Sequence, residues 1–329
     1  MNNTIRFGAV AAGAALALSA CSSSPEEESV DYKACRVSDA GGFDDKSFNQ
    51  AGYEGLQQAE AELGVEINVA ESSDGADYAP NIDSLVADGC DLIITVGFLL
   101  GDATAEAAAA NPEVNFAIID FAYDDAIDNV KPLLFDTNEA AFLAGYAAAG
   151  DTESGVVATF GGIAIPPVTV FMDGFLAGVN YYNDENGTEV TVLGWDGTDG
   201  AFTGDFEDQT KGQSLTEGFI EQGADIVLPV AGPVGLGAAA AAQEAGIQII
   251  GVDSDWTETA PEYTDVIYTS ILKQMGPAVF DVVAEAISEG GFTNAPYFGN
   301  LANEGVGLAA IDADVSAIEE GIIAGDIDA

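Results

Sequence analysis

The sequence predicts an α/β fold with two doubly wound, parallel-sheet lobes joined by a hinge. From residue 34 onward, short apolar segments alternate with segments of helical periodicity, which is typical of βαβ units. The alternation begins again after a helix expected at 139–149. About 300 residues follow Cys21, enough for two lobes of ordinary domain size. One oversized sheet is the alternative.

The first series of elements occupies residues 34–138. Its strands are expected at 34–39, 67–70, 91–96 and 116–121. Its helices are expected from Ser47, around Ile82 to Val86, and over 102–110. Phe48, Leu56 and Leu63 recur at helical spacing in the first of these helices, and Asn111-Pro112 ends the last.

The second series follows the helix at 139–149. Its strands are expected at 155–160, 190–195, 225–230 and 248–252, and its helices at 168–182, 212–221 and 236–245. Later strands at 266–270 and 306–311, with helices at 277–288 and 315–323, are expected to pass between the lobes. The N-terminal lobe would thus comprise 34–138 plus about 272–300, and the C-terminal lobe 139–271 plus about 301–329.

The N-terminus has the features of a bacterial lipoprotein. Leu18-Ser19-Ala20-Cys21 follows an apolar run that is too short to span a bilayer. Residues 1–20 are therefore predicted to be a lipoprotein signal peptide, and Cys21 to carry acyl chains such as palmitate. Residues 21–33 are a polar spacer. An ordinary secretory signal is the alternative, and both place the working domain outside the cytoplasm. With the acylated cysteine, we expect the protein to be lipid-anchored at the extracytoplasmic face of the cell membrane.

The charge and the absence of histidine exclude several functions. The chain has 56 Asp and Glu, 7 Lys and Arg and no His, with a formal charge of −49. Such a surface repels DNA and RNA, so no nucleic-acid partner is expected. A Ser-His-Asp triad and a His-ligated zinc site are impossible, and we expect no metal and no cofactor. We interpret the acidity as adaptation to a saline medium, which screens self-repulsion.

Two cysteines remain for the folded body. Cys35 and Cys90 each stand just before an expected strand. If those strands are neighbours in a parallel sheet, the two thiols lie at the same end and could form a disulfide in an oxidising compartment. A pair of free buried thiols is the alternative.

Polar or glycine residues follow the expected strands. They are Asp39, Asp120, Gly161, Gly162, Asp196, Gly232, Asp253 and Asp255. Ligands of open α/β sheets bind beyond the carboxyl ends of the strands. Two facing lobes would therefore direct these residues into one cleft, a common place for a small molecule.

Five segments resemble the basic membrane protein family, PnrA-like nucleoside-binding lipoproteins of ABC importers. The most specific is VSDAGGFDDKSFNQ at 37–50, and the others lie at 139–146, 171–178, 231–237 and 251–255. The resemblance implies a type I periplasmic-binding-protein-like fold and a non-enzymatic, monomeric protein. It also implies that a purine or pyrimidine nucleoside is held between the lobes and delivered to an ABC permease.

The same resemblance implies contacts to the base. Asp39 would hydrogen-bond the base edge, with Lys46 or Asn49 near it. Phe48 would stack on the base, and Asp120 would make a further polar contact.

It also implies contacts to the sugar. Asp253 would accept hydrogen bonds from the ribose hydroxyls, Lys273 would reach the same sugar, and Gly232 would let the backbone approach the ligand. A second stacking aromatic is not determined by a motif, and Trp195 and Phe206 are the candidates.

The residues by themselves leave alternatives open. Phe48 could be a core residue, and Asp44 and Asp45 could be helix N-terminal charges. The ligand could be a sugar or a signalling molecule, or the protein could be a ligand-gated sensor whose partner is a receptor ectodomain. Paired carboxylates could also serve a nucleoside hydrolase.

Overall fold

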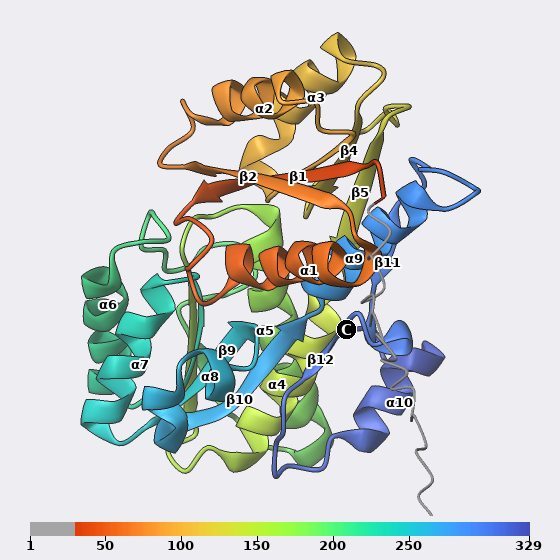
Figure 1. The fold of residues 1–329 in the computed structure, drawn as a ribbon. Coiled ribbons are helices and arrows are strands. Elements are labelled where there is room, and N and C mark those ends of the chain that lie inside the picture. The colour runs from red at the N-terminus through yellow and green to blue at the C-terminus, as the bar shows by residue number, and fades with distance from the viewer. Residues whose placement is uncertain (1–29) are drawn as a thin grey trace, which may run out of the picture.

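Two six-stranded sheets organise residues 30–329, the part of the chain that the computed structural model describes (Figure 1). Their strand orders are β11-β5-β4-β3-β1-β2 and β12-β10-β9-β8-β6-β7. All neighbouring strands are parallel except β10 and β12. The prediction of two α/β lobes with doubly wound parallel sheets is confirmed. The predicted signal peptide, Cys21 and most of the spacer lie outside the described residues.

The first lobe is built around the first sheet. Its strands are β1 (Lys33–Ala40), β2 (Glu66–Ser72), β3 (Leu92–Thr95), β4 (Asn115–Ile119), β5 (Val130–Phe135) and β11 (Tyr297–Gly299). Its helices are α1 (Phe48–Leu63), α2 (Tyr78–Ala87), α3 (Gly101–Ala110) and α9 (Met275–Ile287), with a 3-10 turn η1 (Phe98–Leu100). In Figure 1, α2 and α3 lie above this sheet and α1 and α9 lie below it. All four residues of β3 are buried, because helices cover both faces.

The second lobe repeats this arrangement. Its strands are β6 (Val156–Gly161), β7 (Thr191–Leu193), β8 (Ile226–Val230), β9 (Gln248–Asp253), β10 (Ile267–Lys273) and β12 (Val306–Leu308). Its helices are α4 (Thr137–Asp151), α5 (Pro166–Asn186), α6 (Gln209–Glu221), α7 (Val234–Ala245), α8 (Trp256–Thr259) and α10 (Ser316–Ala324). The 3-10 turns are η2 (Pro261–Val266) and η3 (Leu301–Asn303). Within residues 30–329, no helix is both long and apolar enough to span a bilayer.

The chain passes between the lobes at three places, after β5, after β10 and after β11. These crossings lie side by side. The Asp136 amide donates to the Gly299 carbonyl at 2.8 Å, and the Gln274 amide donates to the Gly305 carbonyl at 3.0 Å. The three segments form the hinge that connects the two sheets.

Glycines allow α4 and α5 to pack in close contact. A Cβ at Gly145 would overlap the carbonyl oxygen of Phe175, and a Cβ at Gly178 would overlap that of Phe142. These glycines belong to the two motifs at 139–146 and 171–178. Part of the sequence of these two motifs is therefore a helix-packing requirement.

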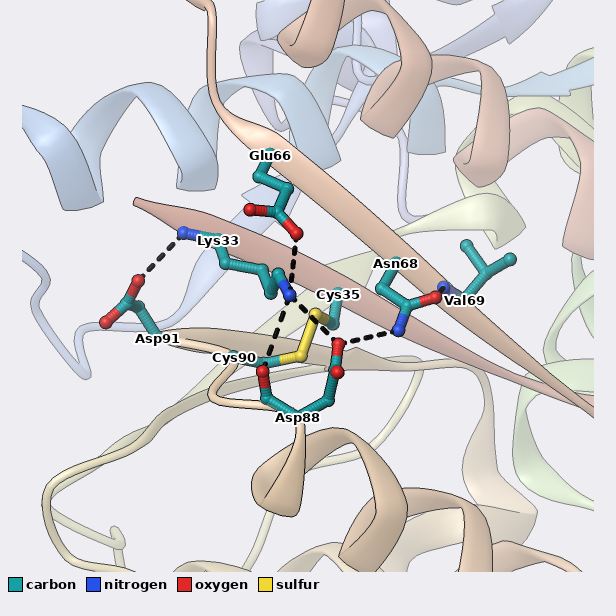
Figure 2. Close-up of a disulfide and its surroundings, with 8 residues drawn as sticks. All are labelled: Lys33, Cys35, Glu66, Asn68, Val69, Asp88, Cys90 and Asp91. Carbon is teal, nitrogen blue, oxygen red and sulfur yellow. Dashed lines mark hydrogen bonds and ion pairs between the residues drawn. A yellow bond between two sulfur atoms is a disulfide. The ribbon is translucent and has the colours of Figure 1, made fainter. Parts of the chain in front are cut away.

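A disulfide joins Cys35 and Cys90, whose Cα atoms are 6.0 Å apart (Figure 2). β1 and β3 are neighbours in the sheet, as the sequence argument required. Of the two alternatives left open by the sequence, the structure contains the bridge. Beside it, the Lys33 ammonium pairs with Glu66 at 2.6 Å and with Asp88 at 2.9 Å, so this end of β1 is tied to β2 and to the C-terminal end of α2.

Candidate ligand-binding site

A cavity of about 650 Å³, counting space open to solvent, lies between the lobes. It is formed beyond the carboxyl ends of β1 and β4 in one lobe and of β8, β9 and β10 in the other. Seven of the eight predicted site residues line it, and they are Asp39, Phe48, Asn49, Asp120, Gly232, Asp253 and Lys273.

Lys46, the eighth predicted site residue, does not line the cavity. It lies in a neighbouring groove, which we call the outer groove; its residues are Gly41, Asp44, Asp45, Lys46, Glu207, Gln209, Pro233, Leu236, Glu262 and Tyr263. The Lys46 ammonium lies 3.4 Å from a carboxylate oxygen of Glu262, in the other lobe. The positive φ of Lys46 (57°) turns the chain just before α1. Lys46 thus links the two lobes outside the cavity.

The other polar strand-end residues have structural roles. Asp196 and Asp255 accept hydrogen bonds from nearby backbone amides, and Asp255 caps α8. A Cβ at Gly161 would overlap the Phe202 ring, and one at Gly162 would overlap the Phe206 ring. Among the residues singled out by position alone, only Asp39, Asp120, Gly232 and Asp253 line the cavity.

A buried ion pair connects the lobes inside the cavity. Lys273, the last residue of β10, is 4% exposed and pairs with Asp120 at the end of β4. Burial raises the pKa of Asp120, while the Lys273 charge opposes that rise. Burial also raises the pKa of Asp253 to about 6, again opposed by Lys273. The Ser47 hydroxyl donates to Asp253 at 2.8 Å, which adds a second contact between the lobes.

Asn49 organises a second polar group in the first lobe. Its Nδ2 donates to Asp39 Oδ1 at 2.7 Å and to Asp45 Oδ2 at 3.0 Å. Asp45 also accepts from the backbone amides of Ser47, Asn49 and Gln50, so it caps α1. The interpretation of Asp45 as a helix N-terminal charge is confirmed. Burial raises the pKa of Asp39 to about 7, and the hydrogen bond from Asn49 opposes this rise.

Four phenylalanine rings supply apolar surface to the cavity, and they are Phe48, Phe98, Phe171 and Phe206. The Lys273 ammonium lies 5.0 Å from the centroid of the Phe48 ring and 5.7 Å from that of Phe171, within cation–π range. Of the two candidates for a second stacking ring, Phe206 lines the cavity. Trp195 does not, because its indole donates to Asp173 at 2.8 Å and its ring packs on Phe202.

Sequence analysis missed Phe98 and Phe171. Phe171 is the first residue of the motif at 171–178, so the motif already contained a signal for it. Phe98 lies in η1, and the sequence offers no pattern that distinguishes it from a core residue.

Backbone strain coincides with the site. In the described part of the chain, the non-glycine residues with positive φ are Lys46, Asp120, Asp253 and Glu304. Asp120 (59°) and Asp253 (70°) carry the two carboxyl groups nearest Lys273. Such conformations cluster at functional sites, where surrounding contacts maintain them. This conformation points both carboxyl groups into the cavity.

The chemistry of the lining favours an uncharged ligand that carries hydrogen-bond donors. Four carboxyl groups, those of Asp39, Asp45, Asp120 and Asp253, face a single ammonium group. A phosphate would meet this excess of negative charge, whereas hydroxyl or ring N–H groups would find acceptors. In residues 30–329, no three Cys, His, Asp or Glu residues are grouped so as to hold a metal ion.

Two hinged α/β lobes around a polar and aromatic cavity define a solute-binding protein. A family model described as "ABC transporter substrate-binding protein PnrA-like" matches residues 33–318, and the chain belongs to this family. The predicted resemblance to the basic membrane protein family is confirmed.

Several named proteins are similar to this chain. An "ABC transporter nucleoside-binding protein BmpA" from Lactococcus lactis is 32% identical and covers 89% of this chain and 85% of the relative. "Basic membrane protein D" from Borreliella burgdorferi is 31% identical and covers 88% of this chain and 82% of the relative. A solved structure of ABC transporter system solute-binding proteins from Aeropyrum pernix has a TM-score of 0.80 and 27% identity, over 90% and 92% of the two chains.

Proposed function

We propose that this protein binds a nucleoside in the cavity and delivers it to an ABC permease. One observation carries the proposal: Asp120, Lys273 and Asp253 form a charged cluster directly beside the Phe48 ring. A nucleoside combines a ribose, whose hydroxyls suit carboxylate acceptors, with a flat base that suits aromatic rings. The similarity to a protein named for nucleoside binding supports the same ligand class.

The proposed contacts divide the ligand between the lobes. Asp253 and Lys273 bind the ribose hydroxyls through charge-assisted hydrogen bonds. Phe48 and Phe206 stack on the base, and each such contact is worth about 1–3 kcal/mol. Asp39 accepts a hydrogen bond from the base edge, with Asn49 beside it.

Gly232 completes the cavity with a backbone segment. Its φ of 53° is costly for residues with a Cβ, and no atom lies closer than 3.9 Å to the place a Cβ would take. The open space leaves room for the ligand to approach the main chain.

Ligand contacts to both lobes favour the closed arrangement. The cluster of Asp120, Lys273 and Asp253 requires the lobes to be together, because its members come from both sheets. Binding therefore stabilises the closed form that a permease would recognise.

We place the protein at the extracytoplasmic face of the cell membrane, tethered through acyl chains on Cys21. The support is the Leu18-Ser19-Ala20-Cys21 sequence and the similarity to proteins named basic membrane proteins. Cys21→Ser should abolish incorporation of labelled palmitate in cells and release the protein from membranes. Retained labelling in the variant would overturn the anchor assignment.

The ligand is tested by calorimetry with inosine, guanosine, adenosine, cytidine and uridine. Ribose, galactose and adenosine monophosphate serve as the comparison set. We expect at least one nucleoside to bind at least 100-fold more tightly than ribose and the monophosphate. Tighter binding of a free sugar would favour the sugar-binding alternative, and release of base and ribose during incubation would favour a hydrolase.

A further inference from the structure

A buried arginine lies below the site and has no role in the contacts described so far. Arg36, in the middle of β1, is 0% exposed. Its Nε, Nη1 and Nη2 atoms have no hydrogen-bond partner among residues 30–329. A buried guanidinium without partners is costly to the fold. Its presence therefore calls for a function.

The neighbours of Arg36 connect it to the cavity. A Cβ at Gly52 of α1 would overlap the guanidinium, so only a glycine there leaves room for it. Gly52 lies one turn after Asn49 on the same face of α1. The guanidinium carbon also lies 5.8 Å from the centroid of the Phe43 ring. Arg36 is thus packed beneath the segment that carries Asp45 and Asn49.

Asp39 and Asp45 are the two acidic residues that Asn49 contacts above Arg36. The Asn49 amide group donates to both carboxyl groups, which places the two acidic side chains on either side of a single NH₂ group. Burial lowers the pKa of Arg36 to about 9, while Asp45 and then Asp39 oppose that shift electrostatically. The cation therefore interacts with both carboxylates.

None of the other charged and titratable groups around Asp39 in the described part of the chain supplies a positive charge that favours its ionised form. Asp45, before α1, and Asp253, on β9, both disfavour the charged form of Asp39. Tyr78 on α2 is neutral at ordinary pH, since burial raises its pKa to about 12. Arg36 is the group whose positive charge favours ionised Asp39.

We propose that Arg36 is a positioning residue, whose buried guanidinium keeps the Asp39 carboxylate charged and held by Asn49 so that it can accept a hydrogen bond from the ligand. The ligand-binding part of this inference rests on the proposed nucleoside function. Asp39 touches the ligand, and Arg36 acts through it.

The first test titrates Asp39 directly, without ligand. Carboxyl ¹³C NMR of the wild-type protein and of Arg36→Met follows the Asp39 signal with pH, and Asp39→Asn assigns that signal. We expect Arg36→Met to raise the titration midpoint of Asp39 by one pH unit or more. Arg36→Lys should return the midpoint most of the way to the wild-type value. A rise of one unit from about 7 would lower the charged fraction of Asp39 at pH 7 about fivefold.

Lys33→Met is the matched control, because it removes a positive charge from the same strand about 20 Å away. It should leave the Asp39 midpoint unchanged. If Arg36→Met does not fold, Arg36→Gln removes the charge and keeps hydrogen-bond donors. An Asp39 midpoint that is the same in the wild type and in the charge-removing variant would overturn the proposal.

The second test measures nucleoside affinity between pH 5.5 and 9 in the same variants. Arg36→Met should bind about fivefold more weakly at pH 7 and regain affinity at pH 9, a pH dependence that a purely structural defect would not produce. In an Asp39→Asn background, Arg36→Met should add no pH dependence. If the wild type binds no nucleoside, the proposed function fails, whereas the NMR titration still decides the role of Arg36.

Discussion

Asp120 and Asp253 share an uncommon backbone conformation at the end of a buried strand. Asp120 directly follows β4, and Asp253 is the last residue of β9. Each adopts a positive φ and places its carboxyl group near Lys273. Asp and Asn tolerate this conformation better than most residues. A carboxylate can therefore be replaced by an amide here without disturbing the backbone.

Asp253→Asn should weaken nucleoside binding by about 10- to 100-fold, the value of one lost charge-assisted hydrogen bond. The fold should be retained, because Asn keeps the size of the side chain and tolerates a φ of 70°. Calorimetry with the best nucleoside measures the effect. Glu304→Gln is the control, since Glu304 has a similar φ (59°) outside the cavity and should leave the affinity unchanged.

The raised pKa values of Asp39 (about 7) and Asp253 (about 6) predict how stability changes with pH. In the unfolded chain both groups titrate near pH ~3.9, so the folded protein binds these protons more tightly. Their contribution to the free energy of unfolding therefore increases as the pH falls from about 8 to about 4.

Thermal unfolding at pH 8 and pH 5 tests this sign, in high salt to reduce the effect of the surface charges. The wild type should gain more stability at pH 5 than an Asp39→Asn, Asp253→Asn double variant. An equal gain in both proteins would contradict the assigned titrations. Nucleoside affinity should change in the opposite direction, because the ligand needs charged acceptors.

The sequence predicted well which polar residues line the cavity, because they follow buried strands and lie in recognisable motifs. Lys46 lies in the outer groove and does not line the cavity, and its positive φ is not apparent from the sequence. Whether Lys46 affects binding stays a prediction. Arg36 gave no signal, because a charged residue within a strand is ordinarily assumed to be exposed.

At the scale of elements, the packing of α4 on α5 depends on glycine. Gly178→Ala should lower the free energy of unfolding by about 1–3 kcal/mol, because the new methyl group overlaps the Phe142 carbonyl oxygen. Gly218→Ala in α6 is the matched control. No atom lies within 4 Å of its Cβ position, so the better helix propensity of Ala should stabilise the protein by about 0.5–1 kcal/mol. Denaturant unfolding compares the two variants.

The disulfide between Cys35 and Cys90 should stabilise the folded protein. It links residues 55 apart in the sequence, and chain entropy assigns such a crosslink about 4 kcal/mol. Reduction should therefore lower the melting temperature of the wild type. It should have no effect on a Cys35→Ser, Cys90→Ser double variant, and an equal shift in that variant would show that the reductant acts elsewhere.

The strands that sequence analysis missed are β5 and β11. β5 contains Lys131 and Pro132, which are atypical of a buried strand, and Lys131 is buried against Glu285 of α9. β11 has only three residues, and its pairing with β5 comes from a segment more than 160 residues away. Short strands of this kind are determined by long-range pairing, which local periodicity does not record.

At the scale of the whole molecule, a formal charge of −49 opposes both folding and lobe closure. Salt shortens the Debye length from about 10 Å at 0.1 M to about 3 Å at 1 M. The melting temperature and the nucleoside affinity should therefore both rise between 0.05 and about 1 M NaCl. Sucrose at equal osmolality is the control, and equal stabilisation by sucrose would contradict an electrostatic origin.

The three adjacent crossings between the lobes restrict how the molecule can open. A rotation about them displaces atoms in proportion to their distance from the axis. Lys273 directly precedes one crossing, whereas Lys46 and Glu262 meet in the outer groove, with side chains 40% and 51% exposed. A few degrees of rotation would thus separate Lys46 from Glu262 while Asp120 and Lys273 stay near each other. The cavity would then open first at the outer groove and last beside the crossings.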